Sequence, residues 1–141
     1  MKSRTVVVAL LTIVWSWTTV AQTSSPMREG NWEVTMKMNM PGMTMEMPPM
    51  KQTQCITAAM IKDPQSAIQK GPGQGDCKVT NYKLSANTAT YTMTCKEPPM
   101  TAEGVMRYSG TDAYTGSLKI DMGGQMMTLE YDSKRIGDCA K

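Results

Sequence analysis

The stretch NWEVTMKMNMPGMTMEM, residues 31–47, decides the fold that we expect for this chain. Apolar side chains occupy every second position, beginning with Trp32 and Val34, and Pro41-Gly42 interrupts the alternation. Successive side chains of a β-strand point to opposite faces of its sheet, and a Pro-Gly pair is typical of a turn. The stretch therefore predicts a β-hairpin with a two-residue turn and one apolar face.

Six methionines lie on that apolar face as three opposed pairs, which together we call the methionine ladder. The pairs are Met36–Met47, Met38–Met45 and Met40–Met43. Methionine fills irregular gaps in cores and forms adaptable apolar surfaces, and its thioether is a soft ligand that favours Cu(I). The ladder is therefore core packing, a surface for an apolar ligand or partner, or a soft-metal site. The sequence leaves all three readings open.

Two further residues extend this candidate site. Trp32 shares the face of the ladder, and Met50 follows Pro48-Pro49 at its edge. The candidate ligand- or metal-binding residues are Trp32, Met36, Met38, Met40, Met43, Met45, Met47 and Met50.

The first residues indicate where the protein works. Lys2 and Arg4 precede an apolar run over residues 6–17, and Thr19-Val20-Ala21 supplies small residues before a cleavage site. This layout is that of a secretory signal peptide, and the run is shorter than a membrane-spanning helix needs. We therefore expect a signal peptide over residues 1–21, a periplasmic or secreted mature protein, and no membrane span after cleavage.

The remainder has the composition of one domain. Residues 22–29 are expected to be a flexible N-terminal segment and residues 30–141 a single β-rich domain, which is long enough for a modest core. The whole chain carries a net charge of +3, and removal of Lys2 and Arg4 with the leader leaves +1. No basic run stands out, so we expect an apolar ligand or an envelope protein as partner and no nucleic acid.

Four cysteines in an exported chain are typical of two disulfides. Cys77 opens one predicted strand and Cys95 ends the next, and a three-residue turn over residues 85–87 sets the two directly opposite one another. Opposed residues of an antiparallel pair lie at a distance that suits a disulfide. The sequence thus predicts Cys77–Cys95 and, by exclusion, Cys55–Cys139.

The rest of the chain has mostly strand patterns. Gly123-Gly124 separates two alternating segments, which predicts a hairpin with Ile120 opposite Met127. Thr57 and Asp63-Pro64 are helix-start signals. The expected fold is mainly β: a curved antiparallel sheet or open barrel of about seven strands, with one short helical insertion and two disulfides.

Five stretches between Gly30 and Cys139 form a distinctive set. They are Gly30-Asn31-Trp32-Glu33-Val34-Thr35, the Met-Pro-Gly-Met turn at 40–43, Gln54-Cys55-Ile56-Thr57, Tyr114-Thr115-Gly116 and Arg135-Ile136-Gly137-Asp138-Cys139. Together they resemble a bacterial exported family catalogued as domain of unknown function 3617. The resemblance implies an exported Gram-negative protein with paired cysteines, and it implies no particular activity.

The sequence lacks the usual elements of catalysis. It contains no His, and its cysteines are expected to be oxidised, so the commonest general base and the thiol nucleophile are missing. No G-x-S-x-G or S-x-x-K motif occurs, and the glycines of residues 71–75 lack the Lys-Ser/Thr of a phosphate-binding loop. We therefore expect no enzyme and no cofactor, with Cu(I) as the one metal worth testing.

The leading interpretation is an exported, non-enzymatic small protein that binds an apolar ligand or a protein partner through its Met-rich face. One alternative is binding of Cu(I) or Ag(I) by the methionine ladder. Another is a structural module of the cell envelope whose methionines are oxidised reversibly.

Overall fold

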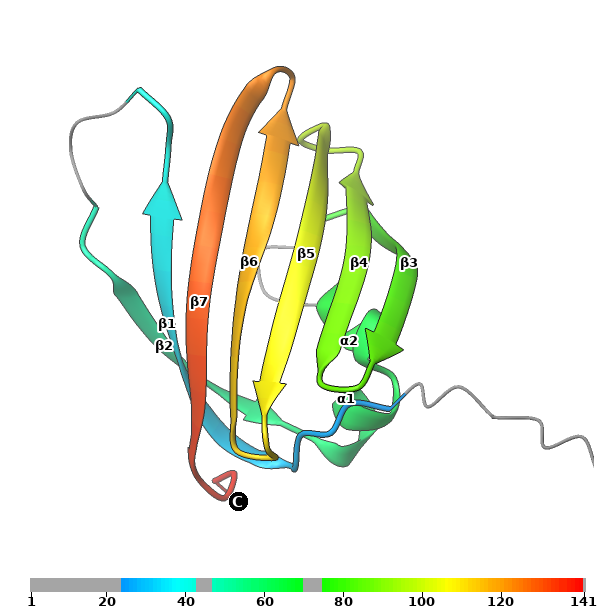
Figure 1. Cartoon of the computed structure of the whole chain (residues 1–141), viewed down its shortest axis with the longest axis vertical. Coiled ribbons are helices and arrows are strands. Elements are labelled where there is room, and N and C mark those ends of the chain that lie inside the picture. The colour runs from blue at the N-terminus through cyan, green and yellow to red at the C-terminus, as the bar shows by residue number, and fades with distance from the viewer. Residues whose placement is uncertain (1–23, 43–46, 70–74, 141) are drawn as a thin grey trace, which may run out of the picture.

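The computed structural model describes residues 24–42, 47–69 and 75–140, which form one antiparallel sheet and two short helices (Figure 1). The strands are β1 (Gly30–Asn39), β2 (Met50–Ile56), β3 (Cys77–Ser85), β4 (Thr88–Cys95), β5 (Met100–Ser109), β6 (Ala113–Met122) and β7 (Gln125–Gly137). The helices are α1 (Ala58–Lys62) and α2 (Pro64–Gln69). The mainly β fold with about seven strands and a short helical insertion is confirmed. The predicted signal peptide, residues 1–21, lies outside the described residues.

The order of the strands in the sheet is β2-β1-β7-β6-β5-β4-β3, so the sheet is open, with β2 and β3 at its two edges. Strands β3 to β7 form a meander in which each strand pairs with the next. The β1–β2 hairpin joins this meander through the pairing of β1 with β7. The connection from β2 to β3 must therefore cross from one edge to the other, and α1 and α2 lie in it against one face of the curved sheet (Figure 1).

That face carries the core. The strand register places Val34, Ser133, Tyr114 and Tyr108 side by side on it. Every second side chain of a strand points to this face, and the buried strand residues are among them, so we call it the apolar face. They include Trp32, Val34, Val79, Ala89, Tyr91, Met93, Ala102, Tyr108, Tyr114, Leu118 and Ile120.

The two helices begin where the sequence predicts. Thr57 is the N-cap of α1, and its side-chain oxygen accepts from the Met60 backbone N–H at 3.4 Å. Asp63 Oδ1 accepts from the Ser66 N–H at 3.0 Å, with Pro64 as the first residue of α2. Caps of this kind satisfy backbone donors that a short helix leaves free. Both helices are far shorter than a membrane span, and no described helix is long and apolar enough to cross a bilayer.

The register predicted for the methionine ladder is wrong. Met36 lies opposite Met50 rather than Met47, because β2 begins only at Met50. Proline has no N–H to donate to a strand partner, so Pro48-Pro49 cannot continue the ladder of hydrogen bonds. The connection between β1 and β2 is therefore residues 40–49 and not a two-residue turn at Pro41-Gly42.

The other two predicted pairs involve residues that the structure does not describe. Met40 and Met47 lie outside the strands. Met43 and Met45 lie in residues 43–46, which fall outside the part of the chain that the structure describes. The predicted pairs Met40–Met43 and Met38–Met45 therefore fall outside the described residues, and the described pairing of β1 with β2 ends at Met36 and Met50.

Both predicted disulfides, Cys77–Cys95 and Cys55–Cys139, are present. Cys77 does lie opposite Cys95, but the three-residue turn behind that prediction is wrong. Ser85 pairs with Thr88, which leaves a two-residue turn, and the register shifts by one residue between Thr80 and Lys83. The two deviations cancel at the cysteines.

The Gly123-Gly124 hairpin is confirmed, with Met122 opposite Gln125 and Ile120 opposite Met127. Both glycines have positive φ, 67° and 96°. Two successive residues of this conformation form the type I′ turn that matches the twist of paired strands.

Two other glycines make room for aromatic rings. Gly104 in β5 lies opposite Tyr91 in β4, and Gly116 in β6 lies opposite Tyr131 in β7. A Cβ atom on either glycine would overlap the ring of its tyrosine. Both rings therefore lie across the strand beside them, where any larger residue would displace them.

We expect Gly116→Ala to lower the free energy of unfolding by about 1–3 kcal/mol, because the added methyl group forces the Tyr131 ring out of a packed site. Urea unfolding with the disulfides intact measures the change. Gly137→Ala is the matched control, because a Cβ there meets no atom within 4 Å. Equal stability of the two variants would contradict the role given to Gly116.

Candidate binding site on the apolar face

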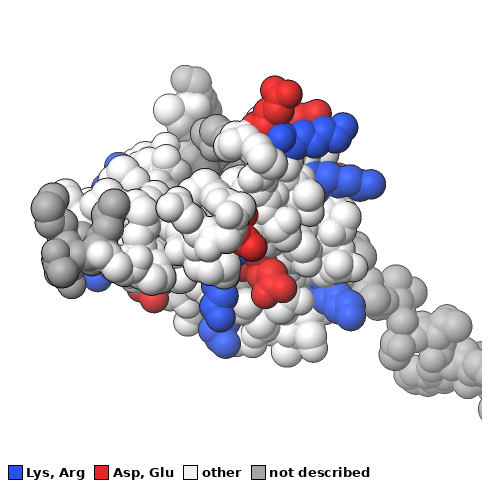
Figure 2. Space-filling view, turned by 90° about the horizontal axis from the view of Figure 1, so that it is seen from above, with Lys and Arg blue, Asp and Glu red and all other residues white. Residues whose placement is uncertain are grey.

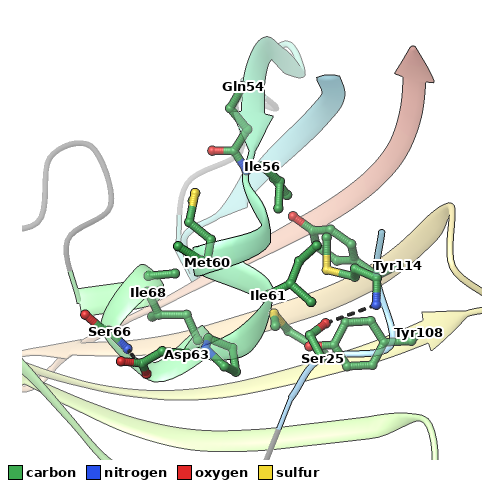
Figure 3. A pocket seen from close by; sticks show the side chains of 15 residues that line it. Ser25, Gln54, Ile56, Met60, Ile61, Asp63, Ser66, Ile68, Tyr108 and Tyr114 are labelled. Atoms are coloured by element: carbon green, nitrogen blue, oxygen red, sulfur yellow. Dashed lines mark hydrogen bonds between the residues drawn. The ribbon is translucent and has the colours of Figure 1, made fainter. Parts of the chain in front are cut away.

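A cavity of about 620 Å³ lies between the two helices and the apolar face of the sheet. Its apolar lining comes from β2 and the helices on one side and from β5 and β6 on the other. These residues are Ile56, Met60, Ile61, Ile68, Met106, Tyr108 and Tyr114. Figure 3 shows Ile61, Tyr108 and Tyr114 converging on the cavity. The topology creates this space, because the β2–β3 connection holds the helices over the sheet.

The polar groups that line the cavity are few. They belong to Ser25, Gln54, Asp63 and Ser66, in addition to the two tyrosine hydroxyls. The Asp63 carboxylate already accepts a hydrogen bond from the Ser66 N–H as the cap of α2. No Lys or Arg is among the described lining residues. The described lining is thus largely apolar.

Residues 24–29, which we call the N-terminal segment, form a further wall. Ser25 and Met27 line the cavity, and the Ser25 N–H donates to Ile61 O of α1 at 3.0 Å. At the other end of the segment the Arg28 N–H donates to Thr111 O at 3.2 Å. The Arg28 guanidinium also forms a two-point ion pair with Asp112, in which Nη2 lies 3.0 Å from Oδ2. The segment is therefore attached both to the helices and to the β5–β6 turn.

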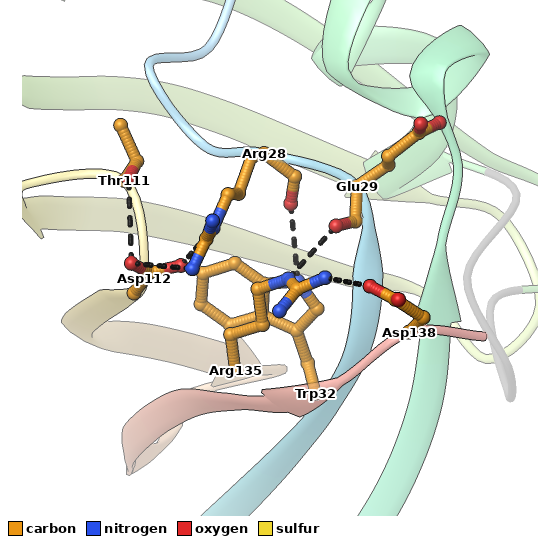
Figure 4. A network of polar contacts seen from close by, with 7 residues as sticks. All are labelled: Arg28, Glu29, Trp32, Thr111, Asp112, Arg135 and Asp138. Carbon is orange, nitrogen blue, oxygen red and sulfur yellow. Dashed lines mark hydrogen bonds and ion pairs between the residues drawn. The ribbon is translucent and has the colours of Figure 1, made fainter.

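A network of polar contacts joins this segment to the β5–β6 turn, the start of β1 and the end of β7 (Figure 4). Arg28 O accepts from Trp32 Nε1 at 3.3 Å, and Glu29 O accepts from Arg135 Nε at 2.9 Å. Arg135 is ion-paired with Asp138. The indole of Trp32 is fully buried, so its N–H needs this partner. Trp32, a predicted site residue, packs in the core behind the cavity and does not line it.

The floor of the cavity belongs to an aromatic cluster centred on Tyr114. Its ring centroid lies 5.6 Å from Trp32, 6.2 Å from Tyr108 and 6.0 Å from Tyr131. The rings meet at tilted or edge-on angles, which are the arrangements that aromatic pairs prefer. Tyr108 is only 3% exposed, and its buried hydroxyl lies beside that of Tyr82.

Of the predicted ladder residues and Met50, the structure places Met36, Met38 and Met50 on the apolar face away from the cavity, and Met40 and Met47 outside the strands. Met36, Met38 and Met40 are half-buried, and Met47 and Met50 are 43% and 53% exposed. None of these lines the cavity, whereas Met27, Met60 and Met106 do. The sequence analysis missed these three methionines and both tyrosines, because their meeting depends on a connection that crosses the whole sheet.

The described charged side chains are mixed in sign. In the face seen in Figure 2, acidic and basic residues lie side by side rather than forming a basic surface. Among the residues that the structure describes, no group of three or more His, Cys, Asp or Glu side chains is placed to hold a metal ion. A hollow of about 400 Å³ on the opposite face of the sheet is lined by Lys37, Arg107, Glu130 and Asp132, so both charges occur in it.

The comparisons with known proteins identify a family but no function. A family model described as "Protein of unknown function (DUF3617)" matches residues 27–139. This match confirms the resemblance that the stretches between Gly30 and Cys139 suggest. No curated protein and no solved structure matches the chain.

The buried tyrosines predict how stability changes in alkali. Burial raises the pKa of Tyr82, Tyr91, Tyr114 and Tyr131 above the ordinary value of about 10. Below that pH both the folded and the unfolded chain keep these protons, and the contribution to stability is complete. Above it the unfolded chain loses protons that the folded chain retains, so the free energy of unfolding falls as pH rises.

We expect these four phenols to ionise only as the protein unfolds. Absorbance at 295 nm and far-UV circular dichroism, followed together through an alkaline titration, measure this. The chain in concentrated urea is the control and should titrate near pH 10. A full phenolate signal near that pH from protein that retains its sheet would contradict the burial described here.

Proposed function

We propose a binding function for this chain, which belongs to the DUF3617 family of proteins of unknown function. It is a small, exported, non-enzymatic protein that binds an apolar ligand on the apolar face of its sheet. The methionines of that face, including Met60 and Met106 of the cavity, give the surface its adaptability.

One observation supports this proposal most strongly. The cavity between the helices and the sheet has a volume of about 620 Å³, within the range of roughly 300–1,000 Å³ that is usual for small-molecule sites. Such sites combine an apolar lining with a few polar groups, as Ile61, Met106 and the two tyrosines do beside Ser25 and Ser66.

The proposals of export and of a role without catalysis rest on separate features. The apolar leader has the layout of a signal peptide, and the described cysteines all lie in disulfides, which persist in oxidising compartments. The one carboxylate of the cavity, Asp63, caps α2, and the chain contains no His that could act with it. Binding therefore accounts for the cavity more simply than a reaction does.

A substitution on α1 tests the cavity. Ala58 and Ala59 are both exposed, but only Ala59 lines the cavity. We expect the wild-type protein to bind the neutral fluorescent probe Nile red, with a rise in emission as the probe leaves water. Ala59→Trp places an indole in the cavity and should weaken binding at least about tenfold, since every ~1.4 kcal/mol of lost contact is a factor of ten.

Ala58→Trp is the matched control and should bind Nile red as the wild type does. Mass spectrometry under native conditions, on protein purified from its own cells, gives an independent measurement, namely a bound mass that organic solvent extracts. Absence of both Nile red binding and an extractable ligand would end the proposal.

A second candidate function, binding of Cu(I), is favoured by the register of β1 and β2. Met36 lies directly opposite Met50, and Met38 is the next residue of β1 on the same face. Opposed Cβ atoms lie about 5 Å apart, so their thioethers can approach one ion. Met50 is 53% exposed, which gives the ion access. Thioether sulfur is the kind of ligand that selects Cu(I).

A competition titration against a Cu(I) chelator decides this second candidate. We expect Met36→Leu and Met50→Leu each to weaken binding at least about tenfold, since even groups outside a ligand set contribute ~10–100-fold. Met126→Leu is the control, because Met126 is 52% exposed but pairs with Asp121 on the opposite face. Wild-type affinity no tighter than that of the Met36 variant would exclude the site.

A further inference from the structure

The two disulfides differ in how far solvent reaches them. Cys77 and Cys95 are only 6% and 4% exposed, and both belong to the hydrophobic core. Cys55, in contrast, is exposed, and Cys139 is half-buried. We infer that the Cys55–Cys139 disulfide is a site of thiol–disulfide exchange, which a dithiol reduces in the folded protein while the other disulfide stays intact.

The Cys77–Cys95 disulfide is enclosed by its neighbours in the core. Val79 and Met93 form the next pair on the same face of these two strands, and each is 1% exposed. Ile68 of α2 packs against the same cluster. A thiolate has to reach a sulfur atom in order to attack it, so this disulfide is reduced only after the protein opens locally.

The Cys55–Cys139 disulfide lies at the edge of the sheet. Cys55 precedes Ile56, which is buried on the apolar face, so its side chain points to the opposite face. β2 is an edge strand, and Cys139 follows the end of β7. Because Asn31 of β1 pairs with both Cys55 and Gly137, the disulfide connects β2 across β1 to the end of β7.

The exchange has two steps, in which atoms and electrons balance. One thiolate of the dithiol attacks a sulfur of the Cys55–Cys139 disulfide, its S–S bond breaks, and a mixed disulfide forms while the other cysteine leaves as a thiolate. The second thiolate of the reductant then attacks the mixed disulfide and releases the remaining cysteine. The protein gains two electrons and two protons and ends with two thiols, and the dithiol becomes a disulfide.

Reduction at this site frees the C-terminal end from β2 and leaves the sheet in place. The pairing of β2 with β1 from Met50 to Ile56 consists of backbone contacts that do not use the disulfide, and so does the pairing of β1 with β7. The hydrogen bond from Arg135 Nε to Glu29 O, at 2.9 Å, also holds the end of β7. We therefore expect a folded product with two thiols and one disulfide.

Reduction of the native protein by dithiothreitol tests the inference. Thiols are trapped with N-ethylmaleimide at set times, and peptide mapping then measures each cysteine. We expect Cys55 and Cys139 to be trapped at least about tenfold faster than Cys77 and Cys95, a ratio that corresponds to about 1.4 kcal/mol of local opening at the core disulfide. The same reaction in concentrated urea is the control, in which this difference should largely disappear.

A second reductant, reduced thioredoxin at the same thiol concentration, identifies the source of the dithiol. Faster reduction of Cys55–Cys139 by thioredoxin than by dithiothreitol assigns the site to a protein dithiol, and slower reduction assigns it to small dithiols.

Two results would overturn the inference. One is an equal rate for the two disulfides in native protein, and the other is loss of both disulfides together with the far-UV circular dichroism signal of the sheet. Each disulfide serves as the control for the other in the wild-type chain, so no variant has to fold. The outcome is also independent of whether the cavity binds a ligand.

Discussion

The structure depends on the pairing of β1 with β7. These strands lie at opposite ends of the domain, yet they form a ladder from Asn31 opposite Gly137 to Asn39 opposite Thr128. No other strand pairing joins the β1–β2 hairpin to the meander in the described sheet. Bringing such distant segments together costs loop-closure entropy when the chain folds. The Cys55–Cys139 disulfide lowers this cost, because it restricts the unfolded chain. The Arg135 contacts with Glu29 and Asp138 reinforce the same junction.

The cavity follows from that pairing. Because β1 lies beside β7, its partner β2 occupies the edge of the sheet opposite β3. The chain must then cross a face of the sheet to pass from Ile56 to Cys77, and it does so as two short helices. These helices bring Met60 and Ile68 to the same cavity as Tyr108, which lies between the helices and the sheet. The site is thus a consequence of strand order rather than of one sequence motif.

The parts of the fold that the sequence predicts correctly are those with local causes. Gly123-Gly124 supplies two residues of positive φ, and Thr57 and Asp63 supply cap oxygens, so each needs only its neighbours. The methionine hairpin failed because a proline pair without N–H groups outweighs the alternation around it. The Cys77 hairpin was correct at the disulfide only because a shift near Asn81, with φ of 54°, offsets a shorter turn.

The candidate site was harder to predict for a related reason. The ladder methionines were chosen from a pattern within one hairpin, whereas the cavity gathers single residues such as Met27 and Met106 from distant segments. Neither residue stands out by its spacing. Their meeting depends on the β1–β7 pairing, and no short-range pattern in one sequence reports such a contact.

The helices and the N-terminal segment, which both line the cavity, are attached to the sheet in different ways. The helical connection is continuous with a strand at each end, and Gln65 Nε2 also donates to Val79 O at 2.8 Å. The N-terminal segment enters the sheet at one end only, and its ion pair between Arg28 and Asp112 has side chains that are 57% and 48% exposed. Exposed pairs are weak and are screened by salt. Of the contacts that hold these two walls in place, the Arg28–Asp112 ion pair is therefore the one that rising ionic strength weakens.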